Sequence, residues 1–594
     1  MLSLLTFIQR GECVKLSANA LEVLKRRYLL RDYKGRIIES PKQMFKRVAK
    51  AVASVDKKFN DDSAKSEDDF FRVMSDLEFL PNSPTLMNAG TPLNQLSACF
   101  VLPIHDNIES IFDGVKDMAL IHKTGGGTGF NFSKLRPKDD IVMSTKGKAS
   151  GPVSFMRVFD SATDVIKQGG KRRGANMAIL NIDHPDIEQF ISAKNFGGFR
   201  NFNFSIAVTD KFMAAVRQNK EIKLINPRNN KAVNRVSAKA LFNKIIENAW
   251  LTGDPGLIFI DEINRKNPLK SLGRIESTNP CGEQPLFPYE SCNLGSINLT
   301  RFVRDKKIDW DKLRDVVRTA VHFLDNVIDL NNFPLPEIRK ATLANRKIGL
   351  GVMGWAEMLI SLGIPYDSDK ALRLADKLMR FITLTAREKS VELGFKRGSF
   401  PNFRKSSWKS RFRALRNSTV TTIAPTGTIS IIAGCSSGIE PLFAVSFVRV
   451  VMEGTRLLEV NSLFEQIAKE RGFFSKRLMN LIAQDGSVRG IKDVPSDIRK
   501  LFVTAFDIRP ETHVKMQAVF QKHTDNAVSK TCNLKQEATK NDVKKIYLLA
   551  HKLKCKGITV YRYGSKKEQV LNFGKKVSVE SEYAGGCPAP YCPF

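Results

Sequence analysis

The chain has 594 residues, of which 42% are hydrophobic and 26% charged, a composition that excludes a wholly disordered or collagen-like protein. It carries 94 Lys and Arg against 61 Asp and Glu, a net charge of +33 that attracts polyanions such as nucleotides or nucleic acid. No apolar run approaches the roughly 20 residues of a membrane span, and the start shows no signal-peptide cleavage site, so we expect a cytoplasmic protein with no membrane partner.

The two ends of the chain differ from its middle. Residues 1–78 form a predicted helical region, because apolar residues such as Leu24, Met44 and Val48 recur at helical spacing between charged residues. Residues 565–594 are first charged and then rich in Gly and Pro, which excludes a regular element and predicts a flexible tail.

The middle of the chain, residues 79–564, alternates short apolar runs with longer amphipathic segments such as 310–331 and 369–393. Strands that alternate with helices predict an α/β domain with crossover connections. No repeat occurs at the periods typical of solenoids. The runs predicted as strands include 98–104, 201–208, 257–263, 419–425, 430–434 and 557–562.

Cysteine usage points to thiol chemistry and away from a structural framework. An odd number spread over a long chain argues against a secreted disulfide scaffold, and no pair of CxxC motifs predicts a zinc site. Each thiol is therefore a candidate for catalysis or redox exchange, with an inert buried side chain as the alternative. The nine are Cys13, Cys99, Cys281, Cys292, Cys435, Cys532, Cys555, Cys587 and Cys592.

The segment STNPCGE places one thiol on a tight loop. Cys281 lies between Pro280 and Gly282, and Asn279 and Glu283 lie two residues to either side. An amide, a thiol and a carboxylate on one short loop offer hydrogen bonding, a sulfur centre and a general base. The alternative, for this segment alone, is a polar turn with a buried cysteine.

Seven motifs in a fixed order give the chain a resemblance to the large catalytic chain of ribonucleotide reductases. The resemblance covers roughly residues 20–565 and implies a ten-stranded α/β barrel with the cysteine loop threaded through its centre. The motifs are NSPTLMNAGTPLNQLSACF, KTGGGTGFNFSKLRP, KQGGKRRGAN, STNPCGEQPL, ESCNLGSINL, NRKIGLGVMGWAEML and TIAPTGTISIIAGCSSGIEPLF.

The resemblance implies a role for each residue of the loop. Cys281 would become a thiyl radical that removes the 3′ hydrogen of the ribose, Glu283 would take the proton of the 3′-hydroxyl, and Asn279 would hold the hydroxyls. Cys99 and Cys292 would protonate the departing 2′-hydroxyl and donate two electrons, ending as a disulfide. Their Cα atoms should then lie roughly 4.4–6.8 Å apart when oxidised.

A small polar loop, PTGTI, predicts a site for the substrate's phosphates, because it offers backbone N–H groups and hydroxyls. Taken alone this is a weak signal, since such loops are common. The glycine run GGGTG is no P-loop, because no GK[ST] follows it. With the residues that the resemblance adds, the expected substrate-binding set is Ser83, Ala98, Gly127, Pro425, Thr426, Gly427, Thr428 and Ile429.

The resemblance also implies a second nucleotide site, for a deoxynucleotide or ATP effector. Arg136 would bind its phosphate and Asp106 would lie near its sugar, beside the basic loop 168–175; the alternative for that loop is a solvated basic turn. The family places this site at a dimer interface, so we expect a homodimer, and the short segment before the first helix predicts no ATP-binding regulatory cone. The basic residues of the loop are Lys171, Arg172 and Arg173.

The predicted tail carries Cys587 and Cys592 among Gly and Pro. It resembles the swinging dithiol that reduces the active-site disulfide by thiol exchange and is itself reduced by a thioredoxin-like partner. Two incidental terminal cysteines are the alternative.

The radical source is predicted from the C-terminal motifs. Tyr561 and Tyr563 are split by Arg562, so the chain lacks the adjacent tyrosine pair of relatives that receive the radical from a second chain. KGITVYR and HTDNAVSKTCNL resemble the adenosylcobalamin-dependent, class II branch, which does not need the DxHxxG cobalamin motif that is absent here. The residues of the cobalamin pocket are not marked by any motif.

The sequence therefore predicts a reductase that makes 2′-deoxyribonucleotides, the precursors of DNA, from ribonucleoside diphosphates with adenosylcobalamin and no bound metal site of its own. One alternative is a class I large chain that needs a separate radical-generating chain. Another is a non-catalytic, basic nucleic-acid-binding protein, although the basic residues are scattered and fit a diffuse surface charge equally well.

Overall fold

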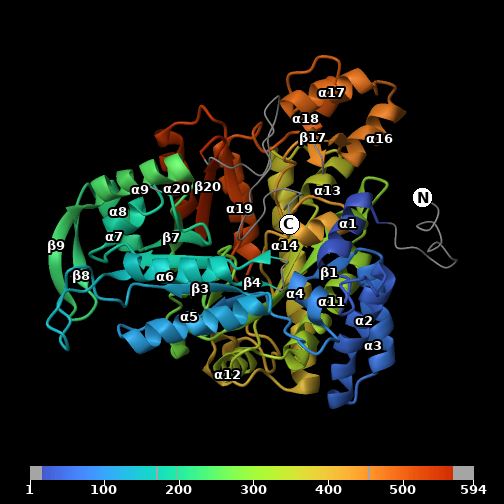
Figure 1. Cartoon of the computed structure of the whole chain (residues 1–594). Helices are drawn as coiled ribbons and strands as arrows, with labels where there is room; N and C mark the ends of the chain where they lie inside the picture. The colour runs from blue at the N-terminus through green and yellow to red at the C-terminus, as the bar shows by residue number, and fades with distance from the viewer. Residues whose placement is uncertain (1–15, 169–171, 196, 452–454, 566–594) are drawn as a thin grey trace.

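The computed structural model describes residues 16–168, 172–195, 197–451 and 455–565. An N-terminal group of helices packs beside a central barrel whose outer face is covered by further helices (Figure 1). The helices of the N-terminal group are α1 (Ala18–Arg27), α2 (Pro41–Ala53), the 3₁₀ turn η1 (Ser54–Phe59) and α3 (Ser63–Ser75).

Local sequence signals explain why the N-terminal region is helical. Ser40 and Gln43 form a capping box at the start of α2, with Pro41 at the first helical position. Met44 and Val48 of α2 are fully buried, and α2 and α3 contact each other and helix α11 (Trp310–Leu330). The prediction of a helical region from apolar spacing is confirmed.

The central sheet has ten strands. Its strands are β1 (Phe79–Pro81), β2 (Cys99–Val101), β3 (Gly127–Asn131), β6 (Asn176–Asn181), β7 (Phe202–Val208), β10 (Gly256–Phe259), β13 (Ser291–Asn298), β16 (Ile348–Met353), β19 (Thr531–Leu534) and β20 (Gly557–Arg562). Paired two-stranded ribbons are β4 (Lys167–Gln168) with β5 (Arg172–Arg173), β8 (Glu221–Asn226) with β9 (Lys231–Ser237), β11 (Ser277–Thr278) with β12 (Pro285–Leu286), β14 (Val303–Arg304) with β15 (Lys307–Ile308), and β17 (Ser446–Val451) with β18 (Thr455–Val460).

The sheet closes into a barrel built from two parallel halves. Strands β2, β3, β6, β7 and β10 are parallel, and β10 meets β20 antiparallel. The other half runs from β20 and β19 through single parallel bridges, Ile423 to Val528 and Leu350 to Thr421, to β16 and β13. Strand β13 then meets β2 antiparallel, which completes the ring. The expected ten-stranded α/β barrel is confirmed.

Helices connect the strands and cover the barrel. Segments 310–331 and 369–393, predicted to be amphipathic, correspond to α11 and to α14 (Asp369–Arg397). The remaining helices are α4 (Ser83–Asn88), α5 (Ile108–Lys123), α6 (Pro152–Val165), α7 (Ile187–Ser192), α8 (Asp210–Gln218), α9 (Ala238–Thr252), α10 (Ile260–Lys266), α12 (Pro336–Asn345), α13 (Trp355–Ser361), α15 (Gly427–Ala433), α16 (Ser462–Glu470), α17 (Lys476–Asp485), α18 (Ser496–Leu501), α19 (Pro510–His523) and α20 (Lys540–Lys552), with short 3₁₀ turns η2 (Lys270–Leu272), η3 (Leu299–Phe302), η4 (Phe403–Lys405) and η5 (Ser407–Ser410).

One of the predicted strands is wrong throughout and another is wrong in its second half. The run 430–434 lies in helix α15 and its end, and the second half of 257–263 begins helix α10. Short apolar runs that are buried on all sides do not distinguish a strand from a helix, because both present an apolar surface all round.

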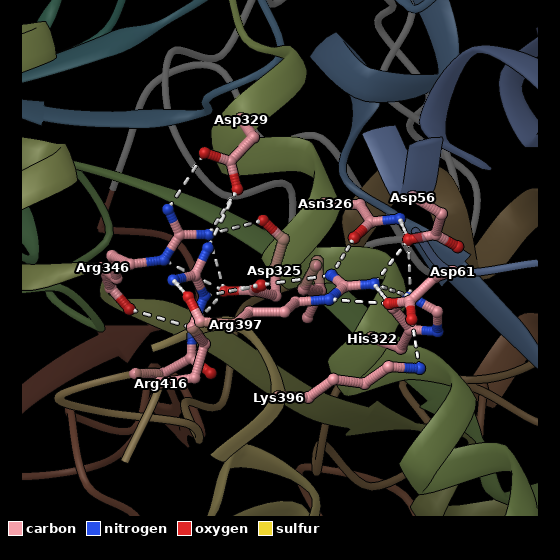
Figure 2. A network of polar contacts seen from close by, with 12 residues as sticks. Asp56, Asp61, His322, Asp325, Asn326, Asp329, Arg346, Lys396, Arg397 and Arg416 are labelled. Atoms are coloured by element: carbon pink, nitrogen blue, oxygen red, sulfur yellow. Dashed lines mark hydrogen bonds and ion pairs between the residues drawn. The ribbon is translucent and has the colours of Figure 1, made fainter. Parts of the chain in front are cut away.

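A buried network of charges joins the N-terminal helices to the barrel (Figure 2). Arg397 at the end of α14 donates from Nη2 to Asp56 Oδ1 and Asp61 Oδ2, both at 2.6 Å. Burial would raise the pKa of Asp56, but hydrogen bonds, that from His322 foremost, lower it overall. Because Arg397 Nη2 also lies 2.8 Å from His322 Nε2, the guanidinium fills the space among these three potential metal ligands.

The same network continues to the barrel wall. Asp325 on α11 accepts hydrogen bonds from Arg346 Nη2 at 2.8 Å and Arg416 Nε at 3.1 Å, and all three side chains are buried. Burial opposes ionisation of Asp325, yet the neighbouring arginines hold its pKa well below the usual range. Among the described residues, no helix is long and apolar enough to cross a membrane.

Candidate active site

The site is built on the hairpin β11–β12, whose connecting loop is residues 279–284. Gly282 has φ +79°, a conformation that glycine adopts without strain, and its N–H donates to Asn279 O at 3.1 Å. The Gln284 N–H donates to Asn279 Oδ1 at 3.0 Å. These bonds make the tight loop that the Pro and Gly beside Cys281 predict.

The barrel encloses this hairpin because its wall carries no side chain where the hairpin passes. A Cβ atom added to Gly129 on β3 would lie 1.7 Å from Thr278 O, and one on Gly127 would lie 2.9 Å from Pro280 Cγ. Asn203 Nδ2 on β7 donates to Pro280 O at 2.9 Å. The two glycines therefore admit the hairpin to the interior.

The opposite wall also binds the hairpin. The carbonyl oxygen of Glu283 accepts hydrogen bonds from Thr422 Oγ1 at 2.9 Å and from Ala527 N at 2.8 Å. These residues belong to the segments that close the barrel through single bridges. The loop thus spans the interior from one parallel half to the other, and its position depends on both.

Three thiols are gathered at this loop. Cys99 on β2 and Cys292 on β13 are direct partners across the antiparallel junction, and both are buried as free thiols. Asn279 Nδ2 donates to Cys99 Sγ at 3.1 Å, and Cys99 Sγ lies 3.8 Å from Glu283 Oε1. Cys281 is half-buried, and it lies close enough for a charge on it to raise the pKa of Cys99. The structure brings together all five residues predicted for catalysis, although they come from two strands and a loop.

Burial controls the protonation of these groups. It raises the pKa of Glu283 to about 7, although hydrogen bonds from Asn279 and Cys99 partly oppose the rise. Burial also raises the pKa of Cys99, and the nearby carboxylate of Glu283 raises it further. Within the described residues Glu283 Oε2 has no hydrogen-bond partner. A carboxyl group with a pKa near neutrality is suited to general acid–base work.

A buried ion pair lies next to the thiols, and the sequence analysis does not predict it. Lys347 Nζ lies 2.6 Å from Glu290 Oε2, and the two side chains are 3% and 1% exposed. Glu290 also accepts from Phe287 N at 2.7 Å and Asn345 Nδ2 at 2.5 Å. Cys292 Sγ donates to the backbone oxygen of Lys347 at 3.6 Å. Both residues lie inside motifs that carry the resemblance, but nothing in their spacing places them beside Cys292.

The residues expected to bind substrate fall into three places. Ala98 and Gly127 adjoin the thiols, since Ala98 N donates to Cys292 O at 3.2 Å and Gly127 N donates to Ala98 O at 2.9 Å. Ser83 opens α4, where its Oγ lies 2.7 Å from Tyr28 Oη. Thr426 has a left-handed backbone, φ +59°, and its Oγ1 accepts from Gly438 N at 2.7 Å.

In the loop itself, Pro425 and Thr426 precede helix α15 and the next three positions form its first turn. The backbone N–H groups of a first helical turn have no partner within the helix. Such groups can bind a phosphate, and phosphate binding at this loop stays a prediction. The three positions are Gly427, Thr428 and Ile429.

For the predicted effector site, Arg136 and Asp106 are in contact. Arg136 Nε donates to Asp106 Oδ2 at 2.8 Å, and Arg136 N donates to Asp106 Oδ1 at 3.1 Å. Arg172 and Arg173 form β5, whose backbone pairs with β4, and β4 lies beside α5. Lys171 lies outside the described residues.

The two C-terminal motifs lie among the described residues: HTDNAVSKTCNL runs from the end of α19 into β19, and KGITVYR forms β20. Tyr561 lies on this strand and Tyr563 directly follows it, and burial raises the pKa of Tyr561 to about 12. Cys587 and Cys592 lie outside the described residues, so the proposed redox tail stays a prediction.

The described chain is thus an α/β barrel of two parallel halves, with a thiol-bearing hairpin inside it and two further thiols on the adjoining strands. The chain matches the family "Ribonucleotide reductase, barrel domain" over residues 97–414 and 411–561, and "Ribonucleotide reductase, all-alpha domain" over residues 14–94. The chain therefore belongs to the ribonucleotide reductase large-chain family.

Several known proteins are similar to this chain. A vitamin B12-dependent ribonucleoside-diphosphate reductase of Thermoplasma acidophilum is 52% identical, with 94% of this chain and 81% of the relative covered. A protein with the same name from Mycobacterium tuberculosis is 50% identical over 98% of this chain and 83% of its own length. The alpha subunit of a class Id ribonucleotide reductase from Actinobacillus ureae superposes with a TM-score of 0.77, covering 94% of this chain and 99% of that subunit. At 23% identity, the last comparison supports the fold alone.

Proposed function

We propose that this chain is a vitamin B12-dependent ribonucleoside-diphosphate reductase that makes 2′-deoxyribonucleotides for DNA synthesis by thiyl-radical chemistry. One observation carries the proposal: Cys281, Cys99, Cys292, Asn279 and Glu283 meet inside the barrel. The names of the relatives at about 50% identity supply the substrate class and the cofactor. The protein would act in the cytoplasm.

In this mechanism each side chain has one task. The Cys281 radical removes the 3′ hydrogen, and Glu283, when ionised, accepts the 3′-hydroxyl proton. Asn279, which is already a donor to Cys99, orients the substrate hydroxyls. Cys99 and Cys292 release two protons and two electrons as they form a disulfide, and the 2′-hydroxyl leaves as water. Burial keeps these steps away from bulk solvent.

Adenosylcobalamin would supply the radical that starts the reaction. The histidine side chains give one test of whether this site suits a cobalamin. Among the described residues no histidine side chain hydrogen-bonds to the hairpin: each except the exposed His105 bonds to a carboxylate, a backbone oxygen or a buried hydroxyl. The bonded ones are His122, His184, His322, His513, His523 and His551. We assign no residue to the corrin.

The substrate's diphosphate would bind at Pro425–Ile429, at the start of α15, and an effector nucleotide would bind near Asp106 and Arg136. An apolar stripe on α5 supports the homodimer: Phe112 is 50% exposed, and Ile108 and Leu120 lie on the same face. Val165, at the end of the neighbouring α6, is 83% exposed. A second copy of the chain would cover this surface.

Turnover by the purified chain tests the proposal. Reduction of a ribonucleoside diphosphate should occur with adenosylcobalamin and a dithiol and without any second protein. Cys281→Ala should lower the rate to below a few per cent of the parent rate while nucleotide binding stays nearly unchanged, and Cys555→Ala, a buried thiol elsewhere, is the matched control. Activity that requires an added metal-containing chain would instead indicate the class I mechanism. A thioredoxin-like protein should replace the dithiol only when Cys587 and Cys592 are intact.

A further inference from the structure

The inner face of one barrel wall carries polar side chains that the proposed mechanism does not use. On strands β7, β10 and β20, alternate residues such as Phe204, Leu257 and Ile558 belong to the apolar core between the sheet and the outer helices. Because successive side chains of a strand point to opposite faces, the residues between them face the interior of the barrel. Ser205 and Thr559 are two of these inward-facing residues.

Four of the inward positions form a single row across neighbouring strands. Ser205 on β7 is paired with Gly256 on β10, and the antiparallel register of β10 with β20 places Gly256 opposite Thr559. Thr559 is paired in turn with Thr531 on β19. These four residues, three hydroxyls with a glycine among them, are called the hydroxyl row below.

The glycine leaves the space above the row open. A Cβ atom added to Gly256 would lie 3.3 Å from Thr559 Oγ1 and 3.4 Å from Ser205 Oγ, so the two hydroxyls converge where a side chain would stand. Ser205 is 6% exposed, and within the described residues neither hydroxyl has a hydrogen-bond partner. Thr559 is exposed although Ile558 and Val560 on either side of it are buried, so the row borders an open space inside the barrel. A ligand in that space can satisfy both hydroxyls.

The surroundings of the row are polar on one side, apolar on the other, and uncharged. Asn533 lies two residues beyond the row on β19, is 6% exposed, and has no partner for its amide within the described part of the chain. Ile179 and Ile258 adjoin the row on β6 and β10 and belong to an apolar cluster on the inner face. Tyr561, two residues beyond Thr559 on β20, adds an aromatic ring to the same face. Such a lining suits a neutral ligand with several hydrogen-bonding groups and a flat ring, and it offers no cation to a phosphate.

The hydroxyl row adjoins the hairpin that carries Cys281. Asn203, two residues before Ser205 on the same face of β7, donates from Nδ2 to Pro280 O at 2.9 Å. Two residues of a strand span about 7 Å, so the row begins about that far from the contact with the peptide next to Cys281. A ligand on the row would therefore lie beside the reactive loop.

We propose that the hydroxyl row binds a neutral nucleoside, with Ser205 and Thr559 as hydrogen-bond partners and Tyr561 as a surface on which the base stacks. The inference rests on the proposed function for the source of the nucleoside, since the cofactor and the ribonucleoside diphosphate each contain one. Binding is measured without turnover. A chain that reduces no ribonucleotide can thus still show the site, and an active reductase whose row variants bind normally would refute this inference alone.

Calorimetric titration of the purified full chain with 5′-deoxyadenosine tests the proposal. Ser205→Ala and Thr559→Val each remove one hydroxyl with little change of shape, and each should weaken binding about fivefold to tenfold. Thr559→Ser keeps the hydroxyl and should keep the affinity. Gly256→Ala should weaken binding further, because its Cβ occupies the space above the row. Thr319→Val, the same exchange on the outer helix α11, is the matched control and should bind like the parent.

Two further titrations identify the source of the nucleoside. If it belongs to the cofactor, the double variant Ser205→Ala, Thr559→Val should lose affinity for adenosylcobalamin but not for hydroxocobalamin, which lacks the adenosyl group, or for cytidine diphosphate. If it belongs to the substrate, affinity for cytidine diphosphate should fall and affinity for adenosylcobalamin should not. Parent-like affinity of the double variant for every probe, or a parent chain that binds neither 5′-deoxyadenosine nor cytidine diphosphate, would overturn the proposal. Urea unfolding of each variant separates a lost contact from a lost fold.

Discussion

Glu283 is predicted to destabilise the folded chain at neutral and alkaline pH. Its side chain is 2% exposed, and burial raises its pKa from 4.5 to about 7. At about 1.4 kcal/mol per pKa unit, this difference corresponds to about 3 kcal/mol between the protonated and ionised forms. The exchange of Glu283 for Gln, which carries no charge at any pH, removes this dependence.

The direction of the effect follows from proton binding. Between pH 4.5 and about 7 the folded chain holds a proton on Glu283 that the unfolded chain has already lost, so the free energy of unfolding falls as the pH rises. The contribution is fully present below pH 4.5 and is lost above about pH 7. Relative to the parent, Glu283→Gln should therefore gain about 3 kcal/mol between these limits.

Urea unfolding followed by tryptophan fluorescence at pH 5 and pH 8 measures this difference. Glu276→Gln, at a partly exposed carboxylate just before the same hairpin, is the matched control and should show the same difference from the parent at both pH values. An equal difference for Glu283→Gln at both pH values would refute the raised pKa. If Glu283 is the base of the reaction, turnover should rise through the same pH range.

Two further substitutions test the parts of the fold that hold the hairpin. Gly129→Ala would place a Cβ atom 1.7 Å from Thr278 O, so it should displace the hairpin and abolish turnover; Gly490→Ala, with no atom within 4 Å of the added Cβ, should leave turnover unchanged. Arg397→Met removes the cation between Asp56 and Asp61 and should lower the free energy of unfolding by about 3–5 kcal/mol. Arg304→Met, at a side chain that is 92% exposed, should change it by less than about 0.5 kcal/mol, as denaturant unfolding can check.

The features that are predicted best from the sequence are those that local residue patterns or a motif determine. Helix α11 follows from apolar periodicity, and the loop around Cys281 follows from the Pro and Gly that flank its thiol. The meeting of Cys99 with Cys292 is different, since the pairing of β2 with β13 brings together residues far apart in the chain. Only the resemblance to a family supplied that contact, because no local pattern determines a non-local strand pairing.

The ion pair of Lys347 and Glu290 shows the limit of sequence reasoning. From sequence alone, a lysine within an apolar motif and a glutamate before a strand are both interpreted as exposed surface charges. Their burial is visible only once β16 and β13 are side by side, with Lys347 just before one strand and Glu290 just before the other. The buried network of Arg397 was missed for the same reason, since its members come from five separate segments.

The hairpin is one of several places in the described chain where buried polar side-chain atoms have no hydrogen-bond partner. Buried polar atoms are nearly always hydrogen-bonded, yet Glu283 Oε2 and both amide atoms of Gln284 have no partner among the described residues. These atoms lie next to Cys281 in sequence, on the loop that two glycines of β3 admit to the interior. Local rules are most often broken where function requires it. Under the proposed mechanism a substrate hydroxyl supplies the donor that Glu283 lacks, and that bond favours the ionised form, the one that accepts the proton.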